Sequence, residues 1–146
     1  MNTQDPIVKI RYFSTPLSKW QVGFADASHS FIVMETRDWY WSMEKVTDAI
    51  IVQRSRECDK VLLYQRGEKR ETRWLWGWSR PSLFFERNPS ITKTTGDIVY
   101  CLWTAIFEKY NLLTSNCKQF SDKLFEEVYP GWSQEAWQER LDDRDL

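Results

Sequence analysis

The stretch Ser28-His29-Ser30-Phe31-Ile32-Val33-Met34-Glu35 is the part of this 146-residue chain that most decides its fold. Four apolar side chains follow one another from Phe31 to Met34, with no polar residue between them. A strand with one solvated face alternates polar and apolar residues, whereas a strand covered on both faces is continuously apolar. The sequence therefore predicts a strand that is buried on both faces.

Other strands are predicted around this segment. Arg37-Asp38 follows it as a turn, because the aromatic and apolar residues resume directly afterwards. Gly67 is expected to close a hairpin or tight loop. The remaining predicted strands are rich in β-branched and aromatic residues, and they span residues 7–13, 39–46, 50–53 and 61–65.

The second half of the chain changes to helical periodicity. Thr94-Thr95-Gly96-Asp97 resembles a capping box, and apolar residues at helical spacing then predict a helix over residues 97–109. A second helix is expected to begin near Asn116 and to end at Pro130-Gly131, with a short polar helix over 133–141. Strands followed by helices predict an α+β fold, in one domain over residues 1–146.

The composition excludes several functional classes. A net charge of −1 gives no general attraction to nucleic acid or anionic lipid. No apolar run is long enough to span a membrane, and the first residues lack the features of a signal peptide, so a cytoplasmic protein is expected. Aromatic residues make up 16% of the chain and include nine Trp, which gives a short chain the means to build a firm core.

The cysteines and the histidine limit the possible chemistry. Three cysteines, Cys58, Cys101 and Cys117, form no CxxC pair, and one histidine cannot complete a usual zinc site with them. We therefore expect no structural metal, no disulfide framework and no cofactor.

Cys117 is the first candidate for a reactive group. If Asn116 caps the second helix, Cys117 is its first residue and faces the positive end of the helix dipole and free backbone N–H groups. Both stabilise the thiolate, which is the nucleophilic form of cysteine, and the same N–H groups can bind a developing oxyanion. The alternative is that Cys117 is a small apolar side chain in the core.

His29 is the candidate base, since it is the only histidine in the chain. A cysteine nucleophile commonly needs a histidine to accept its proton. At the start of a buried strand, an imidazole costs free energy unless it has a polar partner. The alternative is a structural or surface histidine that never meets Cys117.

Residues 110–125, YNLLTSNCKQFSDKLF, resemble the nucleophile segment of the permuted NlpC-like thiol superfamily. The shared features are Tyr110 seven residues before the cysteine, the Asn116-Cys117 pair, and Phe120 three residues after it. The superfamily includes lecithin:retinol acyltransferase-like enzymes and PPPDE isopeptidases.

This resemblance implies a permuted papain-like (NlpC-like) fold, in which the histidine strand precedes the cysteine helix, as His29 precedes Cys117. It implies a hydrolase or acyltransferase acting on an amide, ester or thioester, with Tyr110 helping to stabilise the oxyanion. Gln119 and Ser30 replace the His and Trp that the acyltransferase-like members usually have. A catalytically inactive protein-binding module on the same fold therefore stays an alternative, as does an isopeptidase specific for ubiquitin-like proteins.

Strand register suggests a third catalytic residue. If Arg37-Asp38 is a two-residue turn, His29 lies opposite Val46, and residues two positions from Val46 share its face. These are Glu44 and Asp48, and Glu44 is the preferred partner to orient the imidazole.

Three tryptophans at alternate positions, Trp74, Trp76 and Trp78, have the spacing of one face of a strand. They are candidates to line a substrate groove, although such a row is more often part of a core. The substrate expected from the resemblance is an acyl lipid, a peptide or a ubiquitin-like protein. The sequence does not choose among the three, since one fold serves many substrates.

Overall fold

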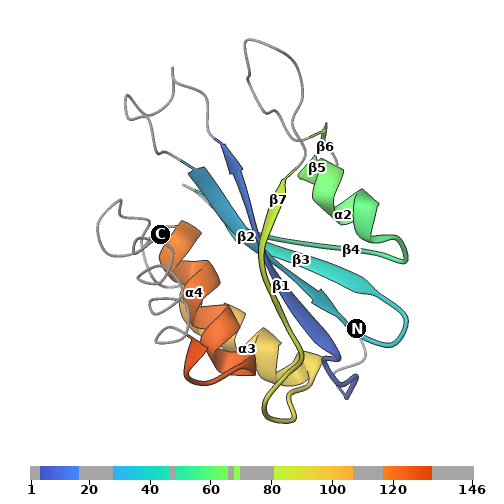
Figure 1. The fold of residues 1–146 in the computed structure, drawn as a ribbon, viewed down its shortest axis with the longest axis vertical. Helices are drawn as coiled ribbons and strands as arrows, with labels where there is room; N and C mark the ends of the chain where they lie inside the picture. The colour runs from blue at the N-terminus through green and yellow to red at the C-terminus, as the bar shows by residue number, and fades with distance from the viewer. Residues whose placement is uncertain are drawn as a thin grey trace, which may run out of the picture.

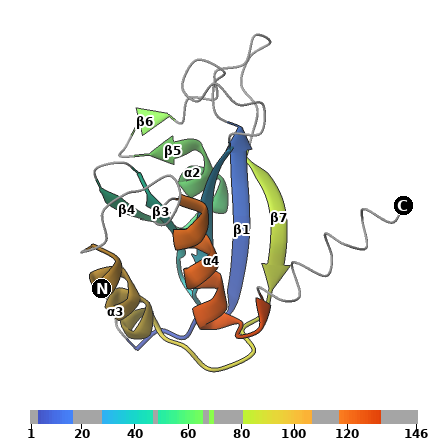
Figure 2. The ribbon, with the colours of Figure 1, turned by 90° about the vertical axis from the view of Figure 1, so that its left-hand side faces the viewer.

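A computed structural model gives the architecture, drawn in Figures 1 and 2. It describes residues 4–16, 28–46, 49–65, 68–69, 81–106 and 117–132. In chain order the elements are β1 (Lys9–Pro16), β2 (Ser28–Glu35), β3 (Tyr40–Lys45), β4 (Ile50–Ser55), α2 (Cys58–Leu63), β5 (Tyr64–Gln65), β6 (Glu68–Lys69), β7 (Ser82–Arg87), α3 (Thr95–Ile106) and α4 (Cys117–Val128).

A five-stranded antiparallel sheet in the order β4-β3-β2-β1-β7 is the centre of the fold. β2 is its middle strand, and every residue from Ser30 to Met34 is buried. The continuous apolar pattern therefore predicted the burial of this strand correctly. Helices accompany the sheet, so the protein is of mixed α+β class.

Helices cover both faces of the sheet. α3 and α4 lie on one face and α2 on the other (Figures 1 and 2). The larger core lies under α3 and α4, where Ile32 and Met34 of β2 meet side chains such as Leu124 and Phe125. The smaller core lies under α2; its buried members are Phe13, Phe31, Val33, Val61 and Leu62. Alternate residues of β2 thus enter different cores, as the pleat of a strand requires.

The turn between β2 and β3 fixes the register on which the site depends. Glu35 pairs with Tyr40 and Ile32 with Met43, and the backbone N–H of Thr36 donates to the carbonyl of Trp39 at 2.9 Å. This leaves Arg37 and Asp38 at the tip of the turn, as predicted. A slip of one residue would have turned every β3 side chain to the opposite face.

Two assignments made from the sequence need correction. The predicted strand over residues 61–65 is wrong, because Cys58–Leu63 form α2 and only the two-residue β5 follows. Val61 and Leu62 bury themselves against the sheet from this helix, and a short apolar run does not distinguish a helix from a strand. β7 was not predicted. All strands were expected to precede the helices, but α2 lies between β4 and β5, so helices and strands are interspersed along the chain.

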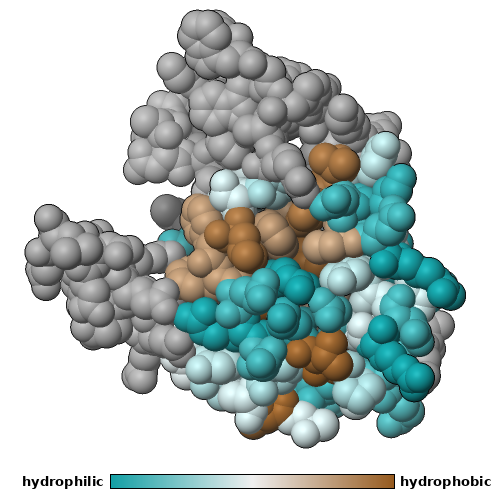
Figure 3. Space-filling view, turned by 45° about the vertical axis from the view of Figure 1, so that its right-hand side comes forward, coloured by the Kyte–Doolittle hydropathy of each residue, from teal (hydrophilic) through white to brown (hydrophobic). Residues whose placement is uncertain are grey.

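β7 forms one edge of the sheet and pairs irregularly with β1. Tyr12 pairs with Phe85 but Phe13 pairs with Leu83, so Phe84 is the extra residue of a bulge. Leu83 and Phe84 are exposed. Figure 3 shows that hydrophobic residues gather in patches between hydrophilic ones on the face that it views.

The two long helices begin close to the predicted positions. α3 starts at Thr95, where the N–H of Thr94 donates to Asp97 Oδ2 at 3.0 Å and the N–H of Asp97 donates to Thr94 Oγ1 at 3.4 Å. The capping box is therefore present. α4 ends at Val128, and Gly131 follows with φ of +91°, a conformation that favours glycine. Gly67 and the predicted helix over 133–141 lie outside the described residues.

Candidate active site

Cys117 is the first residue of α4, and its side chain is buried, with 7% of the residue exposed. α4 packs on β2, which brings this end of the helix to the beginning of the strand. Backbone N–H groups of Ser30, on β2, and of Lys118, on α4, bond to the sulfur. The thiol thus has one donor from the first turn of α4, where backbone N–H groups have no partner within the helix, and one from β2.

His29 is the second residue of β2, next to Ser30, and its imidazole makes a hydrogen-bonding contact with the Cys117 thiol. The ring stacks on that of Phe31, with ring centres 6.2 Å apart. Its side chain is 14% exposed. The structure therefore brings the candidate nucleophile and the candidate base together, although they are far apart in the sequence.

The two groups change each other's protonation. Burial by itself lowers the pKa of His29, but the contact with Cys117, and then with Glu44, raises that pKa to about 9. Burial raises the pKa of Cys117, but the hydrogen bond and charge of His29 and the two backbone N–H groups lower it overall. These directions favour a thiolate–imidazolium pair over two neutral groups.

Glu44 lies behind the imidazole and is fully buried. Its Oε1 is 3.6 Å from Nε2 of His29. This distance is within the range of an ion pair but slightly too long for a hydrogen bond. The β2–β3 register accounts for this proximity, since it turns Glu44 to the same face as His29. A buried carboxylate is costly unless it has a charged partner, and the imidazolium is that partner. Asp48, the other residue considered, lies outside the described residues.

Reasoning from the sequence missed a second polar group beside the site. Tyr12 is buried on β1, and its hydroxyl makes hydrogen bonds with Ser30 on β2 and Asp122 on α4. Asp122 lies five residues after Cys117 in the same helix. The sequence carried no signal for this contact, because which polar side chains meet depends on how α4 crosses the sheet.

The remaining predicted site residues cannot be placed. Tyr110, Trp74, Trp76 and Trp78 lie outside the described residues. Within the described ranges, no three His, Cys, Asp or Glu side chains gather where a metal ion could be held. No helix among these residues is long and apolar enough to span a membrane.

The other two cysteines differ from Cys117. None of the three is in a disulfide, and Cys58 and Cys101 are half-buried. Burial, followed by the negative charge of Glu127, raises the pKa of Cys101. The pKa of the Cys101 thiol is therefore raised, whereas that of the Cys117 thiol is lowered.

Comparison of this chain with protein-family models, with curated proteins and with solved structures finds no match.

Proposed function

We propose that this protein is a cysteine-dependent hydrolase or acyltransferase in which Cys117 is the nucleophile, His29 the general acid and base, and Glu44 the residue that orients His29. The observation that carries this proposal is the contact between the Cys117 thiol and the His29 imidazole at the N-terminus of α4. The buried carboxylate of Glu44 behind the imidazole supports it.

The first half of the reaction forms an acyl-enzyme. The Cys117 thiolate attacks the carbonyl carbon of an amide, ester or thioester, and a C–S bond forms while the carbonyl electrons move to oxygen. The backbone N–H of Cys117 donates to this oxyanion. The oxyanion then collapses, the bond to the leaving group breaks, and His29 gives its proton to that group.

The second half restores the enzyme. His29, now neutral, takes a proton from water or from another acceptor, which attacks the acyl carbon. The C–S bond breaks and its electrons return to sulfur, so the thiolate–imidazolium pair forms again. Glu44 stabilises the imidazolium before and after each turnover, which is the role of the carboxylate in a catalytic triad.

We also propose a fold family, a range of substrates and a cellular location. The order of a histidine strand before a cysteine helix, together with the antiparallel sheet, agrees with a permuted papain-like architecture. The proposed substrates are acyl lipids, peptides or ubiquitin-like proteins. A cytoplasmic location is proposed as well, because none of the three cysteines is in a disulfide.

The experiment is labelling with three classes of thiol-directed probe, which carry a ubiquitin-like protein, a short peptide or a lipid ester. We expect one class to modify the full chain at Cys117, and Cys117→Ala to abolish the labelling. Cys101→Ala is the matched control and should label normally. If all three probes leave Cys117 unmodified while the chain is folded, the enzyme proposal is wrong and the inactive binding module takes its place.

A further inference from the structure

A chain of hydrogen bonds connects three elements beside Cys117. Tyr12 on β1 is 3% exposed, and its hydroxyl contacts both the hydroxyl of Ser30 on β2 and the carboxylate of Asp122 on α4. Ser30 is likewise buried, at 4% exposure. This chain joins β1 and β2 to the helix that carries the nucleophile.

The chemistry of the three groups fixes the direction of these bonds. An ionised carboxylate only accepts, so the Tyr12 hydroxyl donates to Asp122 and accepts from the Ser30 hydroxyl. Burial, and then the negative charge of Asp122, raise the pKa of Tyr12, so its hydroxyl stays protonated and remains a donor.

The Tyr12 ring is held on several sides, which fixes where its hydroxyl lies. Its centre is 5.4 Å from that of Trp132, 6.4 Å from that of Phe125 and 6.0 Å from that of Phe85. A ring packed in this way cannot swing away from its partners without disturbing the larger core. The hydroxyl is therefore a fixed point between the sheet and α4.

This chain of bonds reaches the nucleophile through Ser30. The side chain of Ser30 bonds to Tyr12, while its backbone N–H bonds to the Cys117 sulfur. The titratable groups that act on Cys117 or belong to this chain of bonds are His29 on β2, with Glu44 on β3 behind it, Tyr12 on β1, and Asp122 on α4 as the partner of Tyr12.

We propose that Tyr12 is a positioning residue for Cys117: by joining Ser30 on β2 to Asp122 on α4, its hydroxyl holds the backbone N–H of Ser30 against the sulfur. This inference rests on the proposed role of Cys117 as a nucleophile. The three proposed catalytic residues lie on β2, β3 and α4, and this inference adds a residue of β1 to the site.

The test is the pH dependence of Cys117 alkylation by iodoacetamide in the full chain, followed by mass spectrometry at each cysteine. Only the thiolate reacts, so the rate below the thiol pKa measures that pKa, and the plateau at high pH measures access to the sulfur. For Tyr12→Phe we expect the rate below the pKa to fall by about three- to tenfold, since one unit of pKa is tenfold in thiolate, with an unchanged plateau.

Tyr40→Phe is the matched control, because Tyr40 is a half-buried tyrosine of β3 that packs against the smaller core. It should leave the Cys117 profile unchanged. Cys101 in the same samples reports on the fold, and its profile should be the same in every variant. Ser30→Ala removes the other end of the hydrogen-bond chain without touching the Tyr12 ring, and should shift the Cys117 profile in the same direction as Tyr12→Phe. It keeps the test valid if Tyr12→Phe does not fold.

Two results would overturn the inference about Tyr12 alone. The first is an alkylation rate of Cys117 at low pH that is unchanged in Tyr12→Phe and Ser30→Ala. The second is an equal fall of that rate at all pH values, which would show lost access to the sulfur and not a smaller thiolate fraction. A wild-type profile in which Cys117 ionises no more readily than Cys101 would overturn the proposed function, and the role of Tyr12 with it.

Discussion

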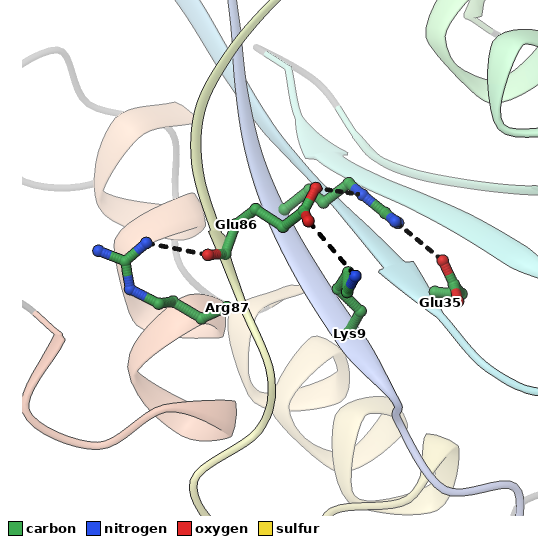
Figure 4. A network of polar contacts seen from close by, with 5 residues as sticks. Lys9, Glu35, Glu86 and Arg87 are labelled. Carbon is green, nitrogen blue, oxygen red and sulfur yellow. Dashed lines mark hydrogen bonds and ion pairs between the residues drawn. The ribbon is translucent and has the colours of Figure 1, made fainter.

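Two clusters of charged and polar residues, one at each end of β2, show what distinguishes the candidate site. In the first, on β1, β2 and β7, Arg11 contacts Glu35 at 2.9 Å and Glu86 at 3.0 Å, and Lys9 also reaches Glu86 at 3.3 Å (Figure 4). Its carboxylates are partly exposed, at 26% and 39% of their side chains.

The second cluster consists of Glu44, His29 and Cys117. Its carboxylate has no exposure at all, and its distance to the imidazole, 3.6 Å, is longer than any contact in the first cluster. The Arg11 cluster is partly solvated and its contacts are short, so it joins the strands at a small desolvation cost. A buried carboxylate beside an imidazole and a thiol adds little to stability, because desolvation offsets the attraction. Stability alone therefore does not account for the second cluster, whereas the proposed catalytic role does.

The largest expected effect comes from removing the sulfur. Cys117→Ala should abolish turnover of the substrate class found with the probes, a loss of at least about a thousandfold, because the proposed mechanism has no acyl acceptor without the sulfur. Steady-state rates measure it. Cys101→Ala, which removes a thiol whose pKa is raised, should retain full activity. Activity that survives in Cys117→Ala would transfer the reaction to another residue.

Removing the base should have the next largest effect. His29→Ala should lower the rate about a hundredfold or more, because a general acid and base is lost. In the wild type, the His29 pKa of about 9 also sets a limit: activity should fall as the pH rises through about 9, where the imidazolium loses its proton. A pH–rate profile with no decline there would contradict the assigned role.

Glu44→Gln should sharpen the comparison, since it removes only a charge. We expect activity to fall by about tenfold, and the His29 pKa to move to lower pH, because the neutral amide no longer stabilises the imidazolium. NMR titration of His29 measures the shift, and circular dichroism checks the fold. If neither the titration nor the activity changes, Glu44 has no part in the site.

Glu86→Gln is the same chemical change in the Arg11 cluster and should have the smallest effect. Arg11 keeps its contact with Glu35, so the free energy of unfolding should fall by no more than about 1 kcal/mol. Urea unfolding measures this change, and Cys117 labelling should be unaffected. An equal loss of labelling in Glu86→Gln and Glu44→Gln would remove the distinction between the two clusters.

The sequence predicted the features that depend on local pattern. The burial of β2, the turn at Arg37-Asp38 and the N-terminus of α4 follow from residue type and spacing. The proximity of Glu44 to His29 could also be expected, because a two-residue turn determines the whole register of a hairpin.

The features that depend on tertiary packing could not be predicted in the same way. The run Val61-Leu62 is compatible with a strand or a helix. It is helical where it packs on Phe31 and Val33 of β2, a contact that the sequence does not indicate. The contact of Tyr12 with Asp122 depends on where α4 crosses β1 and β2, and nothing in the spacing of the two residues indicates it.

The order of the elements along the chain has a consequence for biosynthesis. His29 and Glu44 leave the ribosome early, on β2 and β3, whereas Cys117 follows late, at the start of α4. Until α4 has been made and has docked on the sheet, the thiol has neither the imidazole nor the Ser30 N–H beside it, and it reacts as an ordinary cysteine. If Cys117 has the proposed role, its activated thiol thus exists only after the last described helix has docked on the sheet.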